Sequence, residues 1–489
     1  MLFNSLDFAI FLPIIFLIYW KILRKKIKSQ NSLILVSSYI FYGWWDWRFL
    51  SLILFSTIVD FIIGQLIFKS ESNKKRKILL ITSLLVNLGL LGFFKYYNFF
   101  LDNFIQAFSL FGRSISSSSL KIILPVGISF YTFQTLSYTI DIYKKKIEPS
   151  YDFLSFAAFV SFFPQLVAGP IERASQLLPQ FYKKRTFDYS KSVDGLRQIL
   201  WGFFKKIVIA DTCATYSNLI FNNYEEYTGL SLFIGAVFFA FQIYGDFSGY
   251  SDIAIGTSRL FGFNLMQNFN FPYFSRDIAE FWRRWHISLS TWFRDYLYIP
   301  LGGSKGSNFN KIRNVFIIFL VSGFWHGSNW TFVAWGAINA FYFLPLLILK
   351  KNRRYTDSIS LNKLLPNLKE SYQILRTFFL VVIAWVFFRS ENIFNAFDFL
   401  QLMFQGLFEK LGYVQVLDLF YFKIGWSFPL IFIVFLTLEW LGRNNQFAIE
   451  KMLLKNSKIF RNFFYYTLII ISIWFLINGE EQEFIYFQF

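Results

Sequence analysis

Long apolar stretches alternate with short polar connections along most of the chain. A helix that crosses a bilayer needs roughly 20 mainly apolar residues, and several stretches approach this length. They lack the strict two-residue alternation of a transmembrane β-barrel, and backbone groups in hydrocarbon must be satisfied within a helix. The pattern therefore predicts membrane-spanning helices in or around residues 8–20, 78–94, 232–241, 315–321, 378–388, 428–441 and 464–477.

The charge distribution agrees with a membrane protein. The chain of 489 residues carries 48 Lys and Arg against 30 Asp and Glu, which gives a formal net charge of +18. The basic residues gather in short clumps between apolar stretches, as in the cytoplasmic loops of membrane proteins. A nucleic-acid partner is therefore not favoured, and the clumps at 21–28, 74–77, 144–146, 183–185 and 350–354 are predicted to face the cytoplasm.

The order of these clumps predicts how the N-terminal part is threaded. No basic residue precedes the first apolar run and no small-residue cleavage site follows it, so it is predicted to be a retained helix that begins outside. Residues 33–69 must then leave and re-enter the cytoplasm, with a turn near 43–47. No crossing is left for residues 97–111, which are predicted to form an interfacial helix or a helical continuation that projects from the bilayer.

No internal repeat or Pro/Ser-rich linker divides the chain. The simplest expectation is one all-α, polytopic membrane domain over residues 1–489. Its motif-bearing core is predicted at about 121–345. A polar loop at 350–370 is expected to separate this core from C-terminal helices at about 373–489.

Two histidines are the candidate acid–base groups, and the sequence contains no others. His326 follows an apolar run in SGFWHGSNW, which predicts a position at membrane depth, where ionisable groups are rare and usually functional. His286 lies in FWRRWHISLS, so it either takes part in chemistry or is hydrated at the interface. Imidazole can accept a proton from a hydroxyl and return it to a leaving thiolate near neutral pH. A metal site is not expected, because no third ligand clusters with the histidines and Cys213 is the single cysteine.

Other polar residues interrupt the apolar stretches without defining a site by themselves. Asp246 and Asp252 lie between long apolar runs in YGDFSGYSDIAIG, and Lys205 and Lys206 lie in GFFKKIVIAD. Two interpretations of the lysines remain open: they face an internal cavity, or they extend to lipid headgroups. The glycines and prolines of stretches such as FFPQLVAGPIER predict either broken helices that line a cavity or close helix packing.

These stretches resemble the membrane-bound O-acyltransferase family, and within it the branch that acetylates alginate and related exopolysaccharides. In that family the histidine of the WHG motif is regarded as catalytic, which carries over to His326, and His286 is the second signature position. Ser328 and Lys144 depart from the commoner residues, a small apolar residue and arginine, without affecting the fold or reaction that the resemblance implies. The matching segments, in order over most of the chain, are PVGISFYTFQTLSYTIDIY, FFPQLVAGPIER, GFFKKIVIAD, YGDFSGYSDIAIG, FWRRWHISLSTWFRDYLYIPLGG, FWHGSNWTFVAWG and FIYFQF.

The resemblance implies a ring of tilted and broken transmembrane helices around a central funnel, in the bacterial cytoplasmic (inner) membrane. The acyl donor, acetyl-CoA, would enter from the cytoplasm, with no tightly bound cofactor and no metal. The acceptor would be an extracytoplasmic polysaccharide such as alginate. It would be acetylated directly or through a soluble periplasmic or extracellular acetyltransferase partner.

The surroundings of His326 lead us to expect that the acyl group passes from the thioester to the acceptor in a single step. His326 would deprotonate the acceptor hydroxyl, which attacks the thioester without an obligatory acyl-enzyme. Trp325 and Trp330 would form aromatic walls of the site. Asn329 would lie about one helical turn beyond His326 if the segment is helical, where it could orient the ring or polarise the carbonyl. The further substrate-binding candidates are Asp246, Arg283 and Arg284.

Two other functions remain open. Enzymes of a sister branch transfer D-alanine to teichoic acid or acylate lipids or proteins, and the motifs do not define the acceptor. A polysaccharide transporter would also place charged residues and broken helices in the membrane, although no repeated halves occur here. The loops 304–310 and 350–372 carry no family motif, and they are predicted to help dock an extracytoplasmic or accessory partner.

Overall fold

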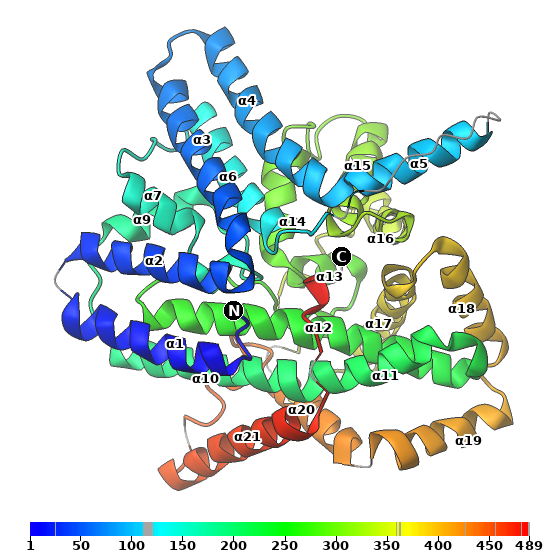
Figure 1. Cartoon of the computed structure of the whole chain (residues 1–489). Helices are drawn as coiled ribbons and strands as arrows, with labels where there is room; N and C mark the ends of the chain where they lie inside the picture. Colours follow the sequence, from blue (N-terminus) through cyan, green and yellow to red (C-terminus); the bar gives the residue numbers. More distant parts are fainter. Residues whose placement is uncertain are drawn as a thin grey trace. The chain divides into compact units, whose positions relative to one another are not determined.

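Helices form all the regular secondary structure of the described chain (Figure 1). The computed structural model describes residues 1–24, 26–110, 120, 122–357, 359–360, 363–425, 427–454, 456–480 and 482–487. No strand occurs among these residues, so the all-α prediction is confirmed for them.

The α-helices are α1 (Leu6–Leu17), α2 (Ile27–Asp46), α3 (Leu50–Lys69), α4 (Asn73–Leu91), α5 (Tyr97–Leu110), α6 (Ile128–Tyr143), α7 (Phe153–Val160), α8 (Phe163–Leu166), α9 (Ala174–Tyr182), α10 (Tyr189–Phe203), α11 (Asp211–Asn222), α12 (Gly229–Leu260), α13 (Ile278–Arg284), α14 (Ile287–Phe293), α15 (Asn308–His326), α16 (Trp330–Ile348), α17 (Leu368–Arg389), α18 (Ile393–Gln405), α19 (Lys410–Asp418), α20 (Ser427–Gly442) and α21 (Lys458–Asn478). The π-helical segments are η1 (Ile18–Ile22), η3 (Gly92–Tyr96), η4 (Phe204–Ala210), η7 (Arg294–Tyr298) and η8 (Leu419–Ile424), and the 3₁₀ segments are η2 (Trp47–Phe49), η5 (Tyr224–Glu226), η6 (Pro272–Phe274) and η9 (Ile485–Phe487).

Six helical stretches of the described chain are long and apolar enough to cross a membrane. Every apolar stretch predicted from the sequence lies in a helix, but residues 8–20, 315–321 and 428–441 fall outside these six. Their helices α1 and α20 are short, and α15 contains Lys311 and Arg313. The candidate spans are Ile27–Lys69, Asn73–Ser109, Gly229–Leu260, Trp330–Ile348, Leu368–Arg389 and Lys458–Asn478.

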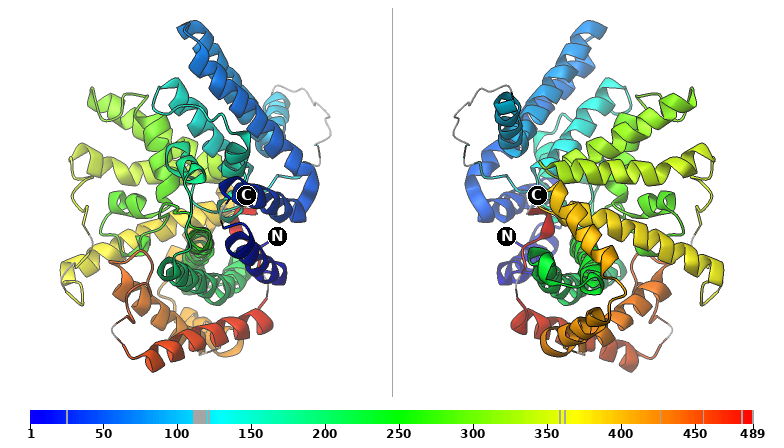
Figure 2. Two further views of the ribbon diagram at one scale, coloured as in Figure 1. Left: turned by 90° about the vertical axis from the view of Figure 1, so that its left-hand side faces the viewer. Right: turned by 90° about the vertical axis from the view of Figure 1, so that its right-hand side faces the viewer.

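The chain divides into two compact units, and the first contains residues 1–195 and 254–266. Within it α3 and α4 lie side by side as a hairpin, and α6 packs against both (Figure 2 shows the hairpin in blue). A buried carboxylate links these helices: Ser83 Oγ donates to Asp60 Oδ1 at 2.6 Å, and Asn87 Nδ2 donates to Asp60 Oδ2 at 2.9 Å. Hydrogen bonds of this kind supplement side-chain packing where lipid removes the hydrophobic drive for helix association.

Two helix boundaries in this unit correspond to sequence predictions. The α2 and α3 helices are separated at η2, just after the turn predicted near 43–47. Helix α5 continues from α4 through η3 and leaves it at a marked angle (Figure 1), with Phe100 and Phe104 exposed. The predicted helix is therefore present, whereas its Phe111 lies outside the described residues. Which side of the membrane each loop occupies stays a prediction.

The second unit contains residues 196–253 and 267–489. Its most extensive helix pair is α15 with α16, which holds the end of α15 where His326 lies. Two glycines allow the close approach: a Cβ on Gly323 would collide with the carbonyl oxygen of Phe332, and one on Gly336 would collide with that of Phe319. Small residues at such crossings are typical of membrane helix packing. Gly323 and Gly336 therefore serve the close packing of α15 against α16.

Candidate active site

His326 is the last residue of α15 and is 3% exposed. Aromatic rings surround its imidazole, with centroid distances of 4.9 Å to Trp325, 5.2 Å to Trp335 and 5.4 Å to Phe388. These rings come from α15, α16 and α17, so three helices fix the orientation of the imidazole. The histidine that the sequence singled out is thus buried in an aromatic cage at a helix end.

His286 lies 6.5 Å from His326, measured between ring centroids. It is the residue before α14, is 1% exposed, and has φ 43° and ψ 55°. The left-handed region is unfavourable for a side chain with a Cβ, and such strain is often found at functional sites, at a cost of about 1–3 kcal/mol. Burial lowers the pKa of His286 to about 3, so its imidazole is neutral over the physiological range.

The tautomer of His286 follows from its contact with Asn268. The Asn268 Oδ1 atom accepts hydrogen bonds from the Ser288 backbone N–H at 3.3 Å and from Ser288 Oγ at 2.8 Å, which fixes which way the amide points. Asn268 Nδ2 donates to Ser251 Oγ at 3.0 Å. Because His286 Nδ1 lies 3.1 Å from the accepting Oδ1, this nitrogen carries the proton. The lone pair of His286 is therefore on Nε2.

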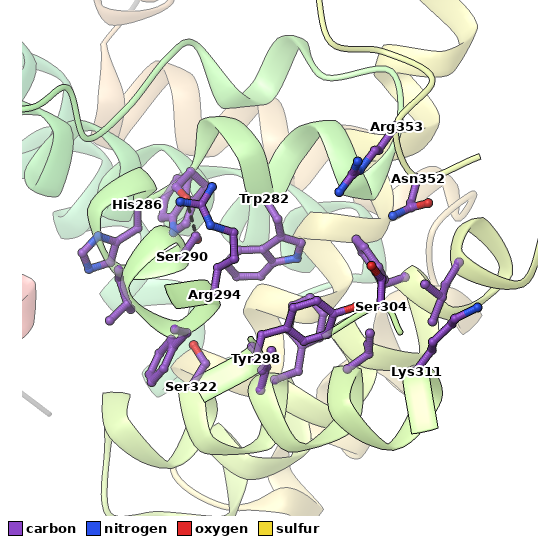
Figure 3. A pocket seen from close by; sticks show the side chains of 18 of the residues that line it. Trp282, His286, Ser290, Arg294, Tyr298, Ser304, Lys311, Ser322, Asn352 and Arg353 are labelled. Atoms are coloured by element: carbon purple, nitrogen blue, oxygen red, sulfur yellow. Dashed lines mark hydrogen bonds between the residues drawn. The ribbon is translucent and has the colours of Figure 1, made fainter. Parts of the chain in front are cut away.

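Both histidines line a pocket of about 520 Å³ in the second unit. Figure 3 shows His286 at one end of this pocket, and Lys311, Asn352 and Arg353 at the other. Between them the walls are largely apolar, with aromatic and aliphatic side chains, and Trp282 and Tyr298 extend into the middle. A volume of this size is typical of a small-molecule site.

All the charged residues that line the pocket are basic. Its lining includes Arg294, Lys311, Lys350 and Arg353, and no acidic residue is among the lining side chains. Positive side chains around a concave site attract anionic ligands and raise their local concentration. The pocket is thus suited to a molecule with an anionic part at the mouth and a reactive part near the histidines.

Lys205 and Lys206 lie within η4 and are both buried. Lys205 Nζ lies 2.6 Å from Asp252 Oδ2, and Lys206 Nζ lies 3.0 Å from Asp246 Oδ1 and 2.7 Å from Asp211 Oδ1. The interpretation that these lysines extend to lipid headgroups is therefore wrong. Their pairing with three carboxylates inside the unit meets the requirement that buried charges be compensated.

This ion-pair cluster holds the C-terminal segment 482–487, red in Figure 1. The backbone N–H of Ile485 donates to Asp246 Oδ2 at 2.7 Å, and Lys206 Nζ donates to the carbonyl oxygen of Gln482 at 3.1 Å. The fixed segment brings the ring of Tyr486 to 4.3 Å from Phe247 and to 5.8 Å from His326, between centroids. Asp246, a substrate-binding candidate in the sequence, thus contacts backbone in this structure.

The residues after His326 differ from the sequence expectation. Helix α15 ends at His326, so the premise that Asn329 follows it by one helical turn is wrong. Asn329 caps α16, with Oδ1 accepting from the N–H of Thr331 at 3.1 Å and Nδ2 donating to the carbonyl oxygen of Glu391 at 2.7 Å. Trp330 is 53% exposed and is not among the residues that line the pocket, whereas Trp325 is buried at 6.0 Å from His286.

Arg283 and Arg284, which precede His286, have different partners. Arg283 donates to the carbonyl oxygens of Asn352 at 2.7 Å and Tyr355 at 2.6 Å, so it holds the loop whose Asn352 and Arg353 line the pocket. Arg284 is buried and pairs with Glu280 at 2.9 Å. Neither lines the pocket, so any effect on a substrate would pass through the loop or through α13.

Sequence reasoning missed several residues of this site, chiefly Asn268, Tyr486 and the pocket-lining Arg294, Lys311 and Arg353. The basic run 350–354 was recognised, but only as a marker of membrane side. Tyr486 lies in the matching segment FIYFQF, which was a signal without an assigned role. Asn268 carries no local pattern that would distinguish it from other polar residues.

Comparisons with known proteins agree with the motifs. Residues 143–360 match the membrane-bound O-acyltransferase family. The chain is 40% identical over 406 residues to the probable alginate O-acetylase of Pseudomonas aeruginosa, an alignment that covers 83% of this chain and 75% of that protein. It is 36% identical over 431 residues to the peptidoglycan O-acetyltransferase of Helicobacter pylori, covering 82% and 79%. The teichoic acid D-alanyltransferase of Streptococcus thermophilus is 30% identical over 230 residues, which cover 43% of this chain and 54% of that protein.

Proposed function

Because the chain belongs to the membrane-bound O-acyltransferase family, we propose that it moves an acetyl group from acetyl-CoA to a hydroxyl of an extracytoplasmic polysaccharide at the His286–His326 site. As a multi-pass membrane O-acyltransferase it is an enzyme, which removes the transporter alternative. The observation that carries the proposal is the pocket with two buried imidazoles at one end and a basic mouth at the other. The finer picture, a funnel of tilted helices in a bacterial cytoplasmic membrane, is part of this proposal.

The donor is proposed to be acetyl-CoA because its chemistry matches the pocket. Coenzyme A carries several phosphate charges at one end and a thioester at the far end of a flexible arm. Lys311, Lys350 and Arg353 provide cations for the phosphates, and the apolar walls can contact the arm. The run 350–354 is predicted to be cytoplasmic, which is the side on which acetyl-CoA is available. No tightly bound cofactor is needed for this reaction.

In the proposed reaction His326 takes the proton of the acceptor hydroxyl as its oxygen attacks the thioester carbonyl. The C–O bond forms, the C–S bond breaks, and His326 returns the proton to the leaving thiolate, giving the acetyl ester and free coenzyme A. The low pKa of His286 makes it a weak base, and its Nε2 lone pair suits it to accept a hydrogen bond from the incoming hydroxyl. The aromatic cage keeps water from competing for the thioester.

A polysaccharide acceptor is supported by the pattern of relatives. The O-acetyl-transferring relatives align over four fifths of this chain or slightly more, whereas the D-alanyltransferase of Streptococcus thermophilus aligns over 43% of it. Those relatives are named for two different glycans, alginate and peptidoglycan. The acceptor is therefore proposed only as a polysaccharide, without a choice between such glycans. Passage through a soluble acetyltransferase is proposed as well. Docking of an extracytoplasmic or accessory partner on loop 304–310 or loop 350–372 stays a prediction. Because residues 350–354 are predicted to be cytoplasmic, only an accessory partner on that side fits the second loop. In the structure Ser304 and Arg353 line the pocket.

Removal of two cations at the pocket mouth is expected to weaken donor binding. In Lys311→Gln/Arg353→Gln the KM for acetyl-CoA should rise roughly 5- to 30-fold with little change in kcat, because partly exposed ion pairs each contribute up to about 1 kcal/mol. Acetyl transfer from labelled acetyl-CoA in membrane vesicles measures both constants. The matched control is Lys305→Gln/Arg354→Gln, which removes one lysine from the segment just before α15 and one arginine next to Arg353, both outside the pocket lining. Equal KM values for the two double variants would contradict this donor site.

Asn268 is expected to act as a positioning residue for His286. In Asn268→Asp the Nδ1 partner remains but gains a negative charge, which favours imidazolium and raises the pKa of His286. Transfer should then fall as the pH is lowered through that raised pKa and recover above it, whereas wild-type His286 stays neutral. The pH profile of kcat/KM checks this, since a residue that only packs would lower the rate without moving the profile.

The control for Asn268 is Ser251→Ala, which removes the hydroxyl that accepts from Asn268 Nδ2 without touching the imidazole. It should reduce the rate modestly and leave the pH profile unchanged. If Asn268→Asp and wild type had the same pH profile, the proposed role of Asn268 in positioning His286 through Nδ1 would be wrong.

A further inference from the structure

A second cavity, of about 550 Å³, lies within the first unit, at the end of α1. Residues from α1, η1 and the loop after them form one wall, and residues 184–187 form the other. Four of its nine lining residues are basic and none is acidic. The basic residues are Lys21, Arg24, Lys184 and Arg185.

Arg185 is the buried member of this group, at 6% exposure. Its Nη2 donates to Asn31 Oδ1 at 2.7 Å, and its Nε and Nη2 lie 3.4 Å from Gln30 Oε1, so all these partners are neutral amides. No carboxylate among the described residues forms an ion pair with it, and its Nη1 has no hydrogen-bond partner there. A buried charge ordinarily requires an opposite charge. The described residues supply none for Arg185, so an anion from outside the chain would compensate its charge.

Aromatic rings from both walls line the cavity. The indole N–H of Trp20 donates to the carbonyl oxygen of Leu260 at 2.8 Å, and the ring of Phe187 packs against Trp20 at 5.5 Å and against Phe16 at 6.0 Å. Leu17 and Phe187 nevertheless keep about half of their surface exposed. Exposed apolar side chains next to a basic cavity suit a ligand with both a charged and a hydrocarbon part.

We propose that this cavity binds the phosphate headgroup of an anionic membrane phospholipid. Arg185 and the three exposed cations surround the phosphate, and the acyl chains extend along Leu17 and Phe187. A lipid is favoured over free phosphate because the cavity lies at the end of the apolar helix α1, where basic side chains meet headgroups. Both basic clumps involved, 21–28 and 183–185, are predicted to face the cytoplasmic leaflet, which is rich in anionic lipid. This inference does not depend on the proposed acetyl transfer.

The test is binding of dioleoylphosphatidylglycerol to the purified full chain in a neutral detergent, measured by native mass spectrometry. One molecule should be retained more strongly than dioleoylphosphatidylcholine. In Lys21→Gln/Lys184→Gln its affinity should fall roughly 20- to 30-fold, because each basic residue near an anionic lipid contributes about five-fold. Both lysines are exposed, so the variant is expected to fold.

The matched control is Lys74→Gln/Lys77→Gln, which removes two exposed lysines from another predicted cytoplasmic clump and should leave the affinity unchanged. Equal retention of the zwitterionic lipid, or an equal loss in both double variants, would overturn the specific site. Inorganic phosphate separates the two sources of anion. If it displaced the lipid at concentrations that leave the rest of the protein unaffected, the site would serve a soluble anion and the lipid assignment would be wrong.

Discussion

His326→Ala is expected to reach the membrane in normal amounts and to lose about 100- to 10,000-fold of its O-acetylation activity, the range for removal of a general base. The imidazole is the ionisable group inside a cage of Trp325, Trp335 and Phe388, and it lies at the inner part of the proposed donor pocket. Without it the acceptor hydroxyl keeps its proton while attacking the thioester. Acetyl ester formed in cells, normalised to protein in the membrane fraction, measures the loss.

His286→Ala should impair transfer less completely, because the low pKa of this buried imidazole gives it a hydrogen-bonding role rather than a basic one. Since His326 is packed among aromatic rings, His326→Gln serves as a second variant that fills more of the space and keeps a polar group. It should be as inactive as His326→Ala while unfolding at nearly the wild-type temperature. Near wild-type acetylation by either His326 variant, at normal expression, would show that the proposed mechanism is wrong.

The helices and the two histidines could be predicted from the sequence because both depend on local signals. Apolar stretches define helices wherever lipid is the solvent, and imidazole at membrane depth is rare enough to be noticed. The sequence singled out His286 and His326 separately, 40 positions apart. That their rings lie 6.5 Å apart is a finding of the structure.

The supporting residues could not be predicted because their roles depend on contacts between distant segments. Asp246 looked like a substrate ligand in a polar motif, yet its partners are Lys206 and the backbone of Ile485, 239 residues further on. Asn329 was assigned by helical spacing, which failed because α15 ends at His326. Lys205 and Lys206 illustrate the same limit: their flanks are apolar in either interpretation, and only the positions of the three carboxylates distinguish between them.

Contacts between distant parts of the chain are expected to affect activity most at the C-terminal segment 482–487. Its backbone is held by Asp246 and Lys206, and Phe484 packs on Tyr250 with ring centroids 4.1 Å apart. This arrangement holds the phenol ring of Tyr486 beside His326, at 5.8 Å. Anchoring the segment through its backbone leaves its side chains to serve the site, so the hydroxyl of Tyr486 is expected to matter beyond packing.

Tyr486→Phe is therefore expected to lower acetyl transfer by roughly tenfold or more, a loss of at least about 1.4 kcal/mol of transition-state stabilisation. The substitution keeps the ring and its contacts with Phe247 and Phe484, so the thermal stability of the protein should be unchanged. The matched control is Tyr250→Phe, which removes one hydroxyl from a ring that packs on Phe484 of the same segment, and it should retain most activity. Rates from labelled acetyl-CoA and unfolding temperatures are measured on the same preparations. Full activity in Tyr486→Phe would mean that the segment only closes the aromatic cage around His326, and the role assigned to the phenol would have to be abandoned.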